Sequence, residues 1–374
     1  MRTIAIPLLV FKLTGSALNL GVTFGLEYLS FGVFSLVGGS LADRLNRKHL
    51  MISCDIVRFA VIAGFAFGFV GRWLSLEMLY GGIVVLAGCG GIFNGGQASS
   101  IPYVLGKDRA TRAVGALAGT ESAVGTVIPP IGGAIFGLVG PLPALIVNAA
   151  TYVASVFSLG AIRDLGPEMI SGFPRLSHVI EDIGIGFRFL VQDRAMRMMT
   201  WSSFIGNFFG LLGFTAYVPF IKRDLGGTDL AVGLAFGAIG AGAMLGALIA
   251  PHLKFPFGKI VIATYLESFL YIPLFWTHSV TVTIVILGLG GIAAGASITQ
   301  IIAWRMRIIP EETVGRVFGA VRLLVVAGAL PGALIGGAIA DKFGARTTIE
   351  VFLLGTYALA LWLATNRTIL EERR

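Results

Sequence analysis

Long apolar runs recur from one end of the chain to the other, and they restrict the possible folds more than any other feature. Hydrophobic residues make up 56% of the 374 residues and charged residues only 13%. Soluble domains contain about 25% charged residues. A continuous apolar run of about 18 residues can cross a bilayer as a helix, whereas membrane β-strands alternate. The sequence therefore predicts an all-α membrane protein with many spans.

Twelve candidate spans form two sets of six, separated by a more polar segment. They are predicted at 3–14, 17–42, 50–70, 78–103, 111–138, 141–162, 199–221, 229–253, 259–276, 280–304, 315–340 and 347–366. We therefore expect an N-terminal six-helix half (1–162), a cytoplasmic linker (163–197) and a C-terminal six-helix half (198–374). The first run is shorter than the roughly 20 residues of a full span. We expect a truncated first helix, through a misplaced start or trimming; a genuinely short helix is the alternative.

Lysine and arginine are distributed unequally between the two sides of the predicted membrane domain. If the hinge at 42–49 lies in the cytoplasm, 19 of the 28 basic residues share its side, six lie on the other side and three lie inside spans. Cytoplasmic loops collect Lys and Arg. We therefore expect a multi-pass protein of the cytoplasmic (inner) membrane with both termini in the cytoplasm. The net charge of +8 has the same explanation, so no nucleic-acid partner is indicated.

An internal repeat relates the two predicted halves. With a constant offset of 204 residues, 112–140 aligns with 316–344, and the sequence IGGAI occurs in both segments. Two homologous six-helix halves are typical of transporters whose halves rock about a central site. The linker has apolar residues at helical spacing on one face of 176–197, which predicts an amphipathic helix at the cytoplasmic surface. This helix is a tether or a latch, and we favour the tether.

A short charged hinge, GGSLADRLNRKHL at 38–50, joins the second and third predicted spans. Gly39, Asp43 and Arg44 match the signature G-x-x-x-D-[RK]-x-G-x-[RK]-[RK], with Asn46 in place of its second glycine. In this hinge the chain resembles the major facilitator superfamily of transporters. Its loop at 310–320 and its linker sequence GFRFLVQDRAMR resemble the drug- and siderophore-efflux branch, which includes macrolide-efflux proteins and an enterobactin exporter. The resemblance implies the major facilitator fold, with twelve transmembrane helices in two pseudo-symmetric halves.

The resemblance also implies that the hinge acts as a conformational latch. In the family pattern, Asp43 faces the N-terminal end of the eleventh helix, where the helix dipole favours an anion. We expect Arg47 and Lys48 to reach acids of neighbouring loops when the cytoplasmic side closes. The corresponding hinge of the second half, at 246–259, lacks the acid, so we expect a one-sided latch. The proposed latch consists of Gly39, Asp43, Arg44, Arg47, Lys48, Asp108 and Glu311.

Carboxylates inside predicted spans are candidates for proton coupling, because a charge in the bilayer is costly. Glu121 lies roughly 13 Å into the fifth span, near mid-bilayer, and is the strongest candidate. A hydrogen bond to a neighbouring helix is its alternative role. Glu267 lies roughly 12 Å into the ninth span. Asp55 is three residues before Arg58, so an ion pair between these two is the more conservative interpretation of that acid.

The fourth and tenth helices line the central cavity if the resemblance holds. Five polar residues are candidates for the cavity wall: Asn94, Gln97, Ser297, Gln300 and Arg322. Arg322 would pair with an acid or bind an anionic group of the substrate. The fourth and tenth helices are also rich in glycine, and we expect the pairs Gly91/Gly95 and Gly291/Gly295 to permit close helix packing.

Export of a small, amphiphilic molecule by proton antiport is the leading functional hypothesis. Proton-coupled uptake by the same fold is the alternative, because the residues do not specify direction. A receptor or membrane enzyme is a remote third, since neither convergent catalytic groups nor a phosphate-binding loop is found. The two cysteines and four histidines form no metal-ligand pattern. We therefore expect no cofactor or metal, and a monomer whose partners are the substrate, a proton and the lipid bilayer.

Overall fold

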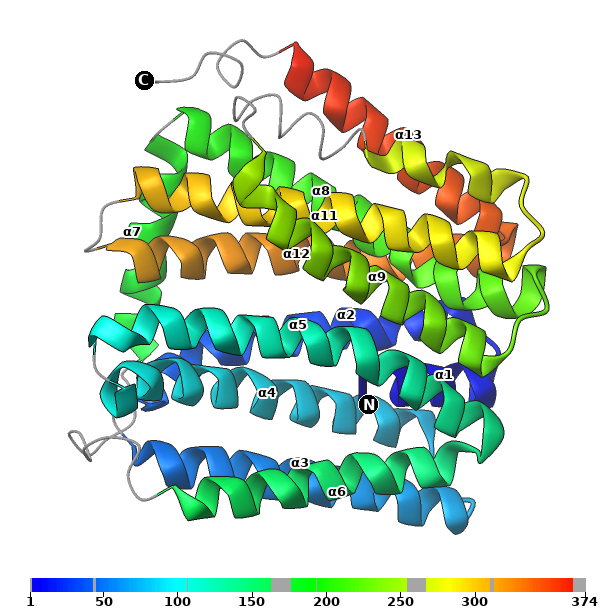
Figure 1. Ribbon diagram of the computed structural model, residues 1–374, viewed down its shortest axis with the longest axis horizontal. Helices are drawn as coiled ribbons and strands as arrows, with labels where there is room; N and C mark the ends of the chain where they lie inside the picture. The colour runs from blue at the N-terminus through cyan, green and yellow to red at the C-terminus, as the bar shows by residue number, and fades with distance from the viewer. Residues whose placement is uncertain are drawn as a thin grey trace.

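The computed structural model describes residues 2–42, 45–105, 107–162, 176–192, 194–253, 267–309 and 313–365. Within these ranges the chain is helical apart from short turns and contains no strand, which confirms the predicted all-α class (Figure 1). Nine helices in the described ranges are long and apolar enough to cross a membrane. Two shorter apolar helical segments, Thr3–Thr14 and Thr126–Leu138, add to them.

The helices follow the predicted order in two halves. The N-terminal half comprises α1 (Arg2–Thr14), α2 (Ala17–Ala42), α3 (Arg47–Val70), α4 (Leu76–Leu105), α5 (Lys107–Leu138) and α6 (Pro141–Ala161). The linker contains α7 (Leu176–Gln192). The C-terminal half comprises α8 (Arg194–Pro219), η1 (Phe220–Asp224), α9 (Asp229–Ile249), η2 (Ala250–His252), η3 (Glu267–Phe275), α11 (Val280–Ile308), α12 (Val314–Phe343) and α13 (Ala345–Ala364).

Some boundaries differ from the sequence-based spans. Helix α8 begins at Arg194, inside the segment expected to be linker, because the apolar face of its first turn is buried: Met196 and Met199 are fully inaccessible. Of the predicted ninth span, the structure describes only the 3₁₀-helical part, η3. Helix α7 confirms the predicted linker helix and packs against α12 and α8.

Matching glycines end the fifth and eleventh spans. Gly140, between α5 and α6, has φ of 100°, and Gly344, between α12 and α13, has φ of 96°. Side chains disfavour this region, so glycine suits both turns. The two positions are aligned by the sequence repeat, which supports the repeat as a structural one.

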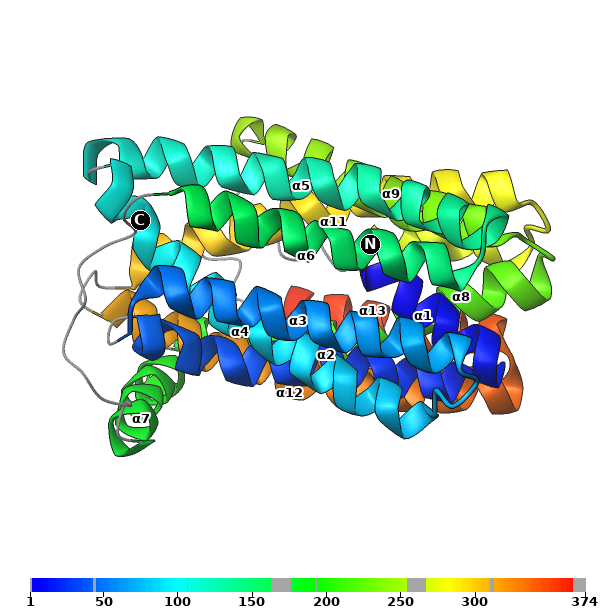
Figure 2. The same cartoon turned by 90° about the horizontal axis from the view of Figure 1, so that it is seen from below.

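Two pairs of helices join the halves, and the repeat relates the pairs. Helix α5 of the N-terminal half packs along α9, and α12 of the C-terminal half packs along α2. Within each half the corresponding partners are α2 with α4 and α9 with α11. Helices α3 and α6 lie side by side at the outer edge (Figures 1 and 2).

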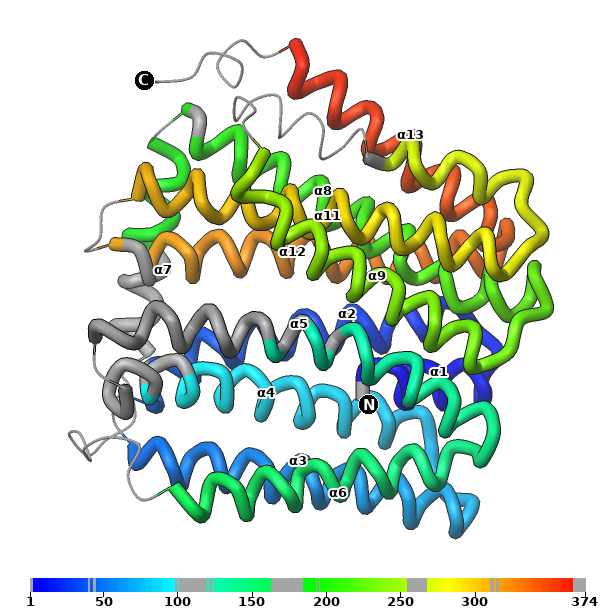
Figure 3. Tube along the Cα trace, viewed as in Figure 1, coloured from blue at the N-terminus to red at the C-terminus, as the bar shows by residue number. Residues whose placement is uncertain are grey.

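The two ends of the helix bundle differ. One end of the bundle, which we call the linker end, contains α7 and the last residues of α2, α6 and α11 (Figure 1). At the opposite turn end, short connections join α1 to α2 and α8 to α9 (Figure 3). The α1–α2 connection turns at Gly15, whose φ is 63°.

Glycine brings the helix backbones into direct contact, as predicted. A Cβ atom at Gly91 would lie 2.6 Å from the backbone nitrogen of Ser35, and one at Gly295 would collide with the carbonyl oxygen of Ala243. Because apolar lipid supplies little hydrophobic drive between helices, such close van der Waals packing contributes much of their association.

Gly295→Ala should therefore destabilise the C-terminal half, by about 1–3 kcal/mol, because the added methyl group forces α11 away from α9. The measurement is the temperature at which half of the detergent-solubilised protein stays monodisperse on gel filtration. Gly64→Ala in α3 is the matched control, since a Cβ there meets nothing within 4 Å. Equal melting temperatures for both variants would contradict the close-packing role.

Candidate functional site

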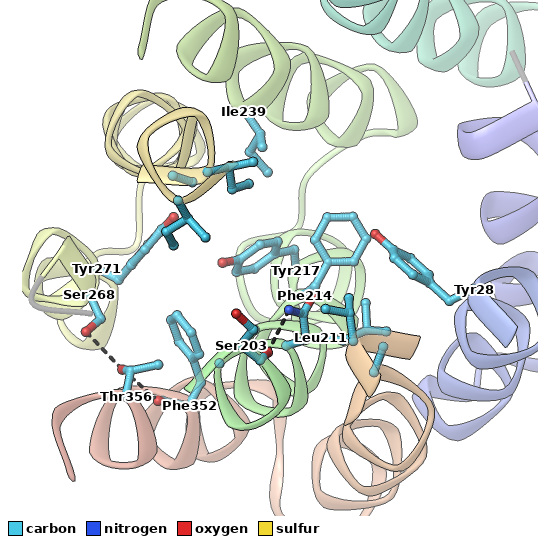
Figure 4. Close-up of a pocket in the computed structure, with 18 of the residues that line it drawn as sticks. Tyr28, Ser203, Leu211, Phe214, Tyr217, Ile239, Ser268, Tyr271, Phe352 and Thr356 are labelled. Carbon is cyan, nitrogen blue, oxygen red and sulfur yellow. Dashed lines mark hydrogen bonds between the residues drawn. The ribbon is translucent and has the colours of Figure 1, made fainter. Parts of the chain in front are cut away.

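A cavity of about 480 Å³ lies among the helices of the C-terminal half (Figure 4). Its wall comes from α8, α9, η3, α11, α12 and α13. In the part of the chain that the structure describes, Tyr28 of α2 is the one lining residue from the N-terminal half. The volume falls in the range of about 300–1,000 Å³ that is usual for small-molecule sites.

Polar side chains occupy a small part of the cavity wall. Thr356 donates a hydrogen bond of 2.9 Å to the hydroxyl of Ser268, so these two groups link α13 to η3 (Figure 4). The amide nitrogen of Asn207 donates to the carbonyl oxygen of Ser203 at 2.8 Å. These bonds fix the orientation of groups that a ligand could meet.

A buried cation lies at the part of the cavity nearest the linker end. Arg305, three residues before the end of α11, is 5% exposed and lines the cavity. Its guanidinium donates to the hydroxyl of Ser203 at 2.7 Å. The predicted span at 280–304 ends just before Arg305, but α11 extends to Ile308 and carries this residue into the bundle.

An aromatic cluster centred on Phe214 joins the two halves. The ring of Phe214 in α8 makes edge contacts with Phe24 of α2, Phe236 of α9 and Tyr217, at centroid distances of 5.1, 5.0 and 5.8 Å. Edge-to-face geometry of this kind is favourable for aromatic pairs. Phe24 belongs to the N-terminal half, so this cluster is a contact between the halves.

A second cavity, of about 340 Å³, adjoins the first at this cluster. Its lining residues are Thr3, Phe24, Glu27, Tyr28, Phe31, Phe214 and Phe236. Tyr28 and Phe214 line both cavities. The guanidinium of Arg322 lies over the ring of Phe31, 4.7 Å from its centroid, as a cation–π contact between α12 and α2. A predominantly aromatic wall with one charged residue, Glu27, among its described lining residues suits an amphiphilic ligand.

The predicted cavity residues differ in how close they lie to the two cavities. Arg322 lies beside the second cavity through Phe31, whereas Asn94 and Gln97 are half-buried in α4 and are not among the lining residues of either cavity. Helix α11 does line the first cavity, but through Ala294, Ile298, Ile301, Ile302 and Arg305. Ser297 is buried elsewhere on that helix, and Gln300 donates to the carbonyl oxygen of Ala250, at the end of α9.

Sequence analysis missed the face of α8 that contributes most to the first cavity. That face consists of Ser203, Asn207, Gly210, Phe214 and Tyr217. Their spacing of three and four residues is that of one helix face. Polar and aromatic residues at this period inside an apolar run are the signal that would have identified it.

Asp55 is held by two donors. Its carboxylate, 1% exposed, accepts from Arg58 at 2.8 Å and from Ser155 of α6 at 2.6 Å. The Arg58 guanidinium also lies 5.0 Å from the ring centroid of Phe93 and 5.7 Å from that of Tyr152. The predicted ion pair is therefore confirmed, and it joins α3 to α6 away from both cavities.

The other predicted acids and part of the latch lie outside the described side chains. Glu121 belongs to α5 and Glu267 is the first residue of η3, but only their backbone is described. The same applies to Asp108 in α5. Asp43, Arg44 and Glu311 fall outside the described residues altogether.

The described latch residues contact carbonyl groups of their own half. Lys48 donates to the carbonyl oxygens of Gly160 and Ile162, at 2.8 and 2.6 Å, and so caps the end of α6. Arg47 donates to the carbonyl oxygen of Ala42, at 3.1 Å. Cations are stabilised there because the last carbonyls of a helix carry partial negative charge. Gly39 has open space where a Cβ would lie.

Comparison with known proteins places these features in a family context. The model of the Major Facilitator Superfamily matches residues 1–327 and 200–371. The multi-drug resistance efflux pump PmrA homolog of Lactococcus lactis is 26% identical, over 94% of this chain and 86% of its own. The enterobactin exporter EntS of Shigella boydii is 27% identical, over 92% of this chain and 81% of its own.

A solved structure shares the fold. The inward-facing, occupied form of a bacterial homolog of the human lysosomal transporter Spinster superposes with a TM-score of 0.76. The match covers 97% of this chain and 92% of that chain, at 15% sequence identity.

Asp55→Asn should destabilise the protein by about 3–5 kcal/mol, because it leaves the buried guanidinium of Arg58 without its counter-charge. The measurement is again the monodispersity midpoint on heating. In the double variant Asp55→Asn/Arg58→Met both charges are gone, and most of the loss should be recovered. If the double variant is no more stable than Asp55→Asn, the ion pair does not explain the effect.

Proposed function

Because the chain belongs to the Major Facilitator Superfamily, we propose that it exports a small amphiphilic molecule across the cytoplasmic membrane by alternating access. Family membership makes it a multi-pass membrane transporter of a small molecule, not an enzyme. The observation that carries the proposal is the pair of adjoining cavities, lined by aromatic rings and a few polar groups, which meet at the aromatic contact between the halves around Phe214.

Export is favoured over uptake by the relatives. One is called a multi-drug resistance efflux pump and another an enterobactin exporter, and each aligns with more than nine-tenths of this chain. The aromatic wall around Phe214 suits the ring systems of such molecules, while Arg305 and Glu27 provide charge at different parts of the site. Uptake would use the same cavities, so direction has to be measured.

We further propose proton antiport, with Glu121 as the main proton-carrying group. Glu121 lies in α5, the helix that packs against α9 across the halves, so its protonation is well placed to bias their arrangement. Glu267, in η3 close to cavity residue Ser268, is the second candidate. Asp55 is ranked last, because both of its oxygens already accept bonds from Arg58 and Ser155.

The proposed orientation follows the distribution of basic residues. The linker end, where α7 lies, faces the cytoplasm, and the turn end faces outward. We propose a monomer as the transporting unit, since each chain contains both halves and the cavities between them.

A susceptibility panel tests the proposal directly. A pump-deficient host expressing the chain is exposed to amphiphilic antibacterial compounds, ethidium and a catecholate siderophore. Export predicts reduced accumulation of at least one probe, and oriented vesicles with an imposed pH gradient then give its direction. Accumulation into the cytoplasmic side that rises with the gradient would establish uptake instead.

Glu121→Gln should abolish pH-gradient-driven transport, because glutamine keeps the size of the side chain but cannot release a proton. Transport in proteoliposomes should fall to the level of empty liposomes, while membrane insertion and the gel-filtration profile stay unchanged. Glu350→Gln, at an exposed acid of α13, is the control and should transport normally. Normal gradient-driven transport by Glu121→Gln would refute the assignment.

Phe214→Ala should weaken binding of an aromatic probe such as ethidium by about tenfold, since it removes the ring shared by both cavities. Fluorescence titration of the purified protein measures the dissociation constant. Phe67→Ala is the matched control, because that ring is 73% exposed on the outside of α3. Equal affinities in the two variants would place the binding site elsewhere.

A further inference from the structure

The connection between α12 and α13 carries a second copy of the hinge signature. Gly337, Asp341, Lys342, Gly344 and Arg346 reproduce the pattern G-x-x-x-D-[RK]-x-G-x-[RK]. The first copy, at 39–48, lies at the linker end, whereas this copy lies at the turn end. The two copies are therefore on opposite faces of the molecule.

Asp341 of this copy binds the N-terminus of α2 across the interface between the halves. Its carboxylate accepts from the hydroxyl of Ser16 at 2.5 Å, and from the backbone nitrogens of Ala17 and Leu18 at 2.8 and 2.9 Å. The first N–H groups of a helix lack intrahelical partners and carry partial positive charge, so a carboxylate is well placed there.

Arg223 of η1 strengthens the same junction. It pairs with Asp341 at 3.2 Å and donates to the carbonyl oxygen of Gly15, which belongs to the N-terminal half. Its guanidinium also lies over the ring of Phe11, 5.2 Å from the centroid. Arg223 and Asp341 of the C-terminal half thus both bind the turn between α1 and α2.

The glycine of the pattern permits this approach. A Cβ atom at Gly337 would lie 2.5 Å from the carbonyl oxygen of Ala17 and 2.7 Å from the Cα of Leu18. Any side chain at this position would push α2 away from α12 and lengthen the bonds that Asp341 makes.

The final basic residue plays the same part in both copies. Arg346 donates to the carbonyl oxygens of Leu274, Phe275 and Thr277, at the end of η3 in its own half. Lys48 likewise caps the end of α6 in its own half. In each copy the basic residue fastens the loop to its own half, and in the second copy the acid, Asp341, contacts the other half.

We propose that residues 337–346, with Arg223, form a latch that closes the turn end of the transporter. This inference rests on the proposed alternating-access function. Asp341 and Arg223 belong to one half and Ser16, Ala17 and Leu18 to the other, so their bonds break whenever the halves separate at this end. The side chains of Arg223 and Asp341 are 42% and 28% exposed. Partly hydrated contacts of this kind are weak enough to open and re-form.

Double electron–electron resonance distances between spin labels test the latch. Labels at Leu13 and Phe343, which are 48% and 62% exposed, report the turn end across the halves. A second pair at Ser158 and Met306, both exposed, reports the linker end. The background is the full-length chain in lipid nanodiscs, with Cys54 and Cys89 replaced by serine so that only the introduced cysteines are labelled.

Asp341→Asn should raise the ratio of open to closed populations at the turn end about fivefold, because the amide removes the negative charge favoured at the helix N-terminus and one of the two acceptor oxygens. The linker-end distance should shorten in the same sample, because the halves rock together. Gly337→Ala should open the turn end by a steric route that leaves both charges in place. Glu350→Gln is the matched acid-to-amide control and should leave both distances unchanged.

Unchanged turn-end distances in a folded Asp341→Asn variant would overturn the latch. If that variant does not fold, Arg223→Gln decides in the same way, because it removes the ion pair and the bond to Gly15 while leaving the Asp341 cap. The distances do not depend on any substrate. A chain whose latch responds as expected but which transports no probe would refute the proposed function and leave the latch standing.

Discussion

Direct contact between helix backbones, made possible by glycine, is the constraint on which the rest of this structure depends. Within the halves it joins α2 to α4 and α9 to α11. Between the halves, Gly133 of α5 meets Gly233 of α9, and Gly21 of α2 meets the carbonyl of Ala333 in α12. Lipid gives little hydrophobic reason for helices to associate, so these contacts are a main source of cohesion.

The wall of the second cavity consists mainly of bulky aromatic side chains and contains no glycine among its described lining residues. Around Phe214 the helices are separated by rings of α2, α8 and α9, and the space left between the rings forms the candidate site. The same layer touches both halves, so in the proposed alternating-access cycle a ligand there contacts surfaces that move relative to one another. Ligand binding and conformational change are thereby linked by geometry.

The helix order, the linker helix and the relation between the two halves could be predicted from the sequence, because apolar run length and a 204-residue repeat are strong signals. The cavity wall could not. A transmembrane helix is apolar on every side, so hydropathy does not separate the face of Ala294 and Ile298 from that of Ser297. Arg305 falls just outside the predicted span at 280–304, because a charged residue in an apolar run resembles the start of a loop, but α11 continues to Ile308 and buries it. The second copy of the hinge signature, at 337–346, can be recognised in the sequence. Its contact with Ser16 cannot be predicted from the sequence, because it depends on how the two halves pack together.

The two halves contribute unequally to the wall of the first cavity, and this inequality has a thermodynamic consequence. All of its described lining residues except Tyr28 belong to the C-terminal half. If that half moves as a rigid body, those contacts travel with the ligand and are the same in every state. A ligand can shift a conformational equilibrium only through contacts that differ between the states. For a ligand in the first cavity, the contacts that differ between states are therefore those with Tyr28 and with the N-terminal residues of the adjoining second cavity, such as Phe24 and Phe31. Two compounds that bind with equal affinity would therefore be transported at very different rates if they differ in these contacts.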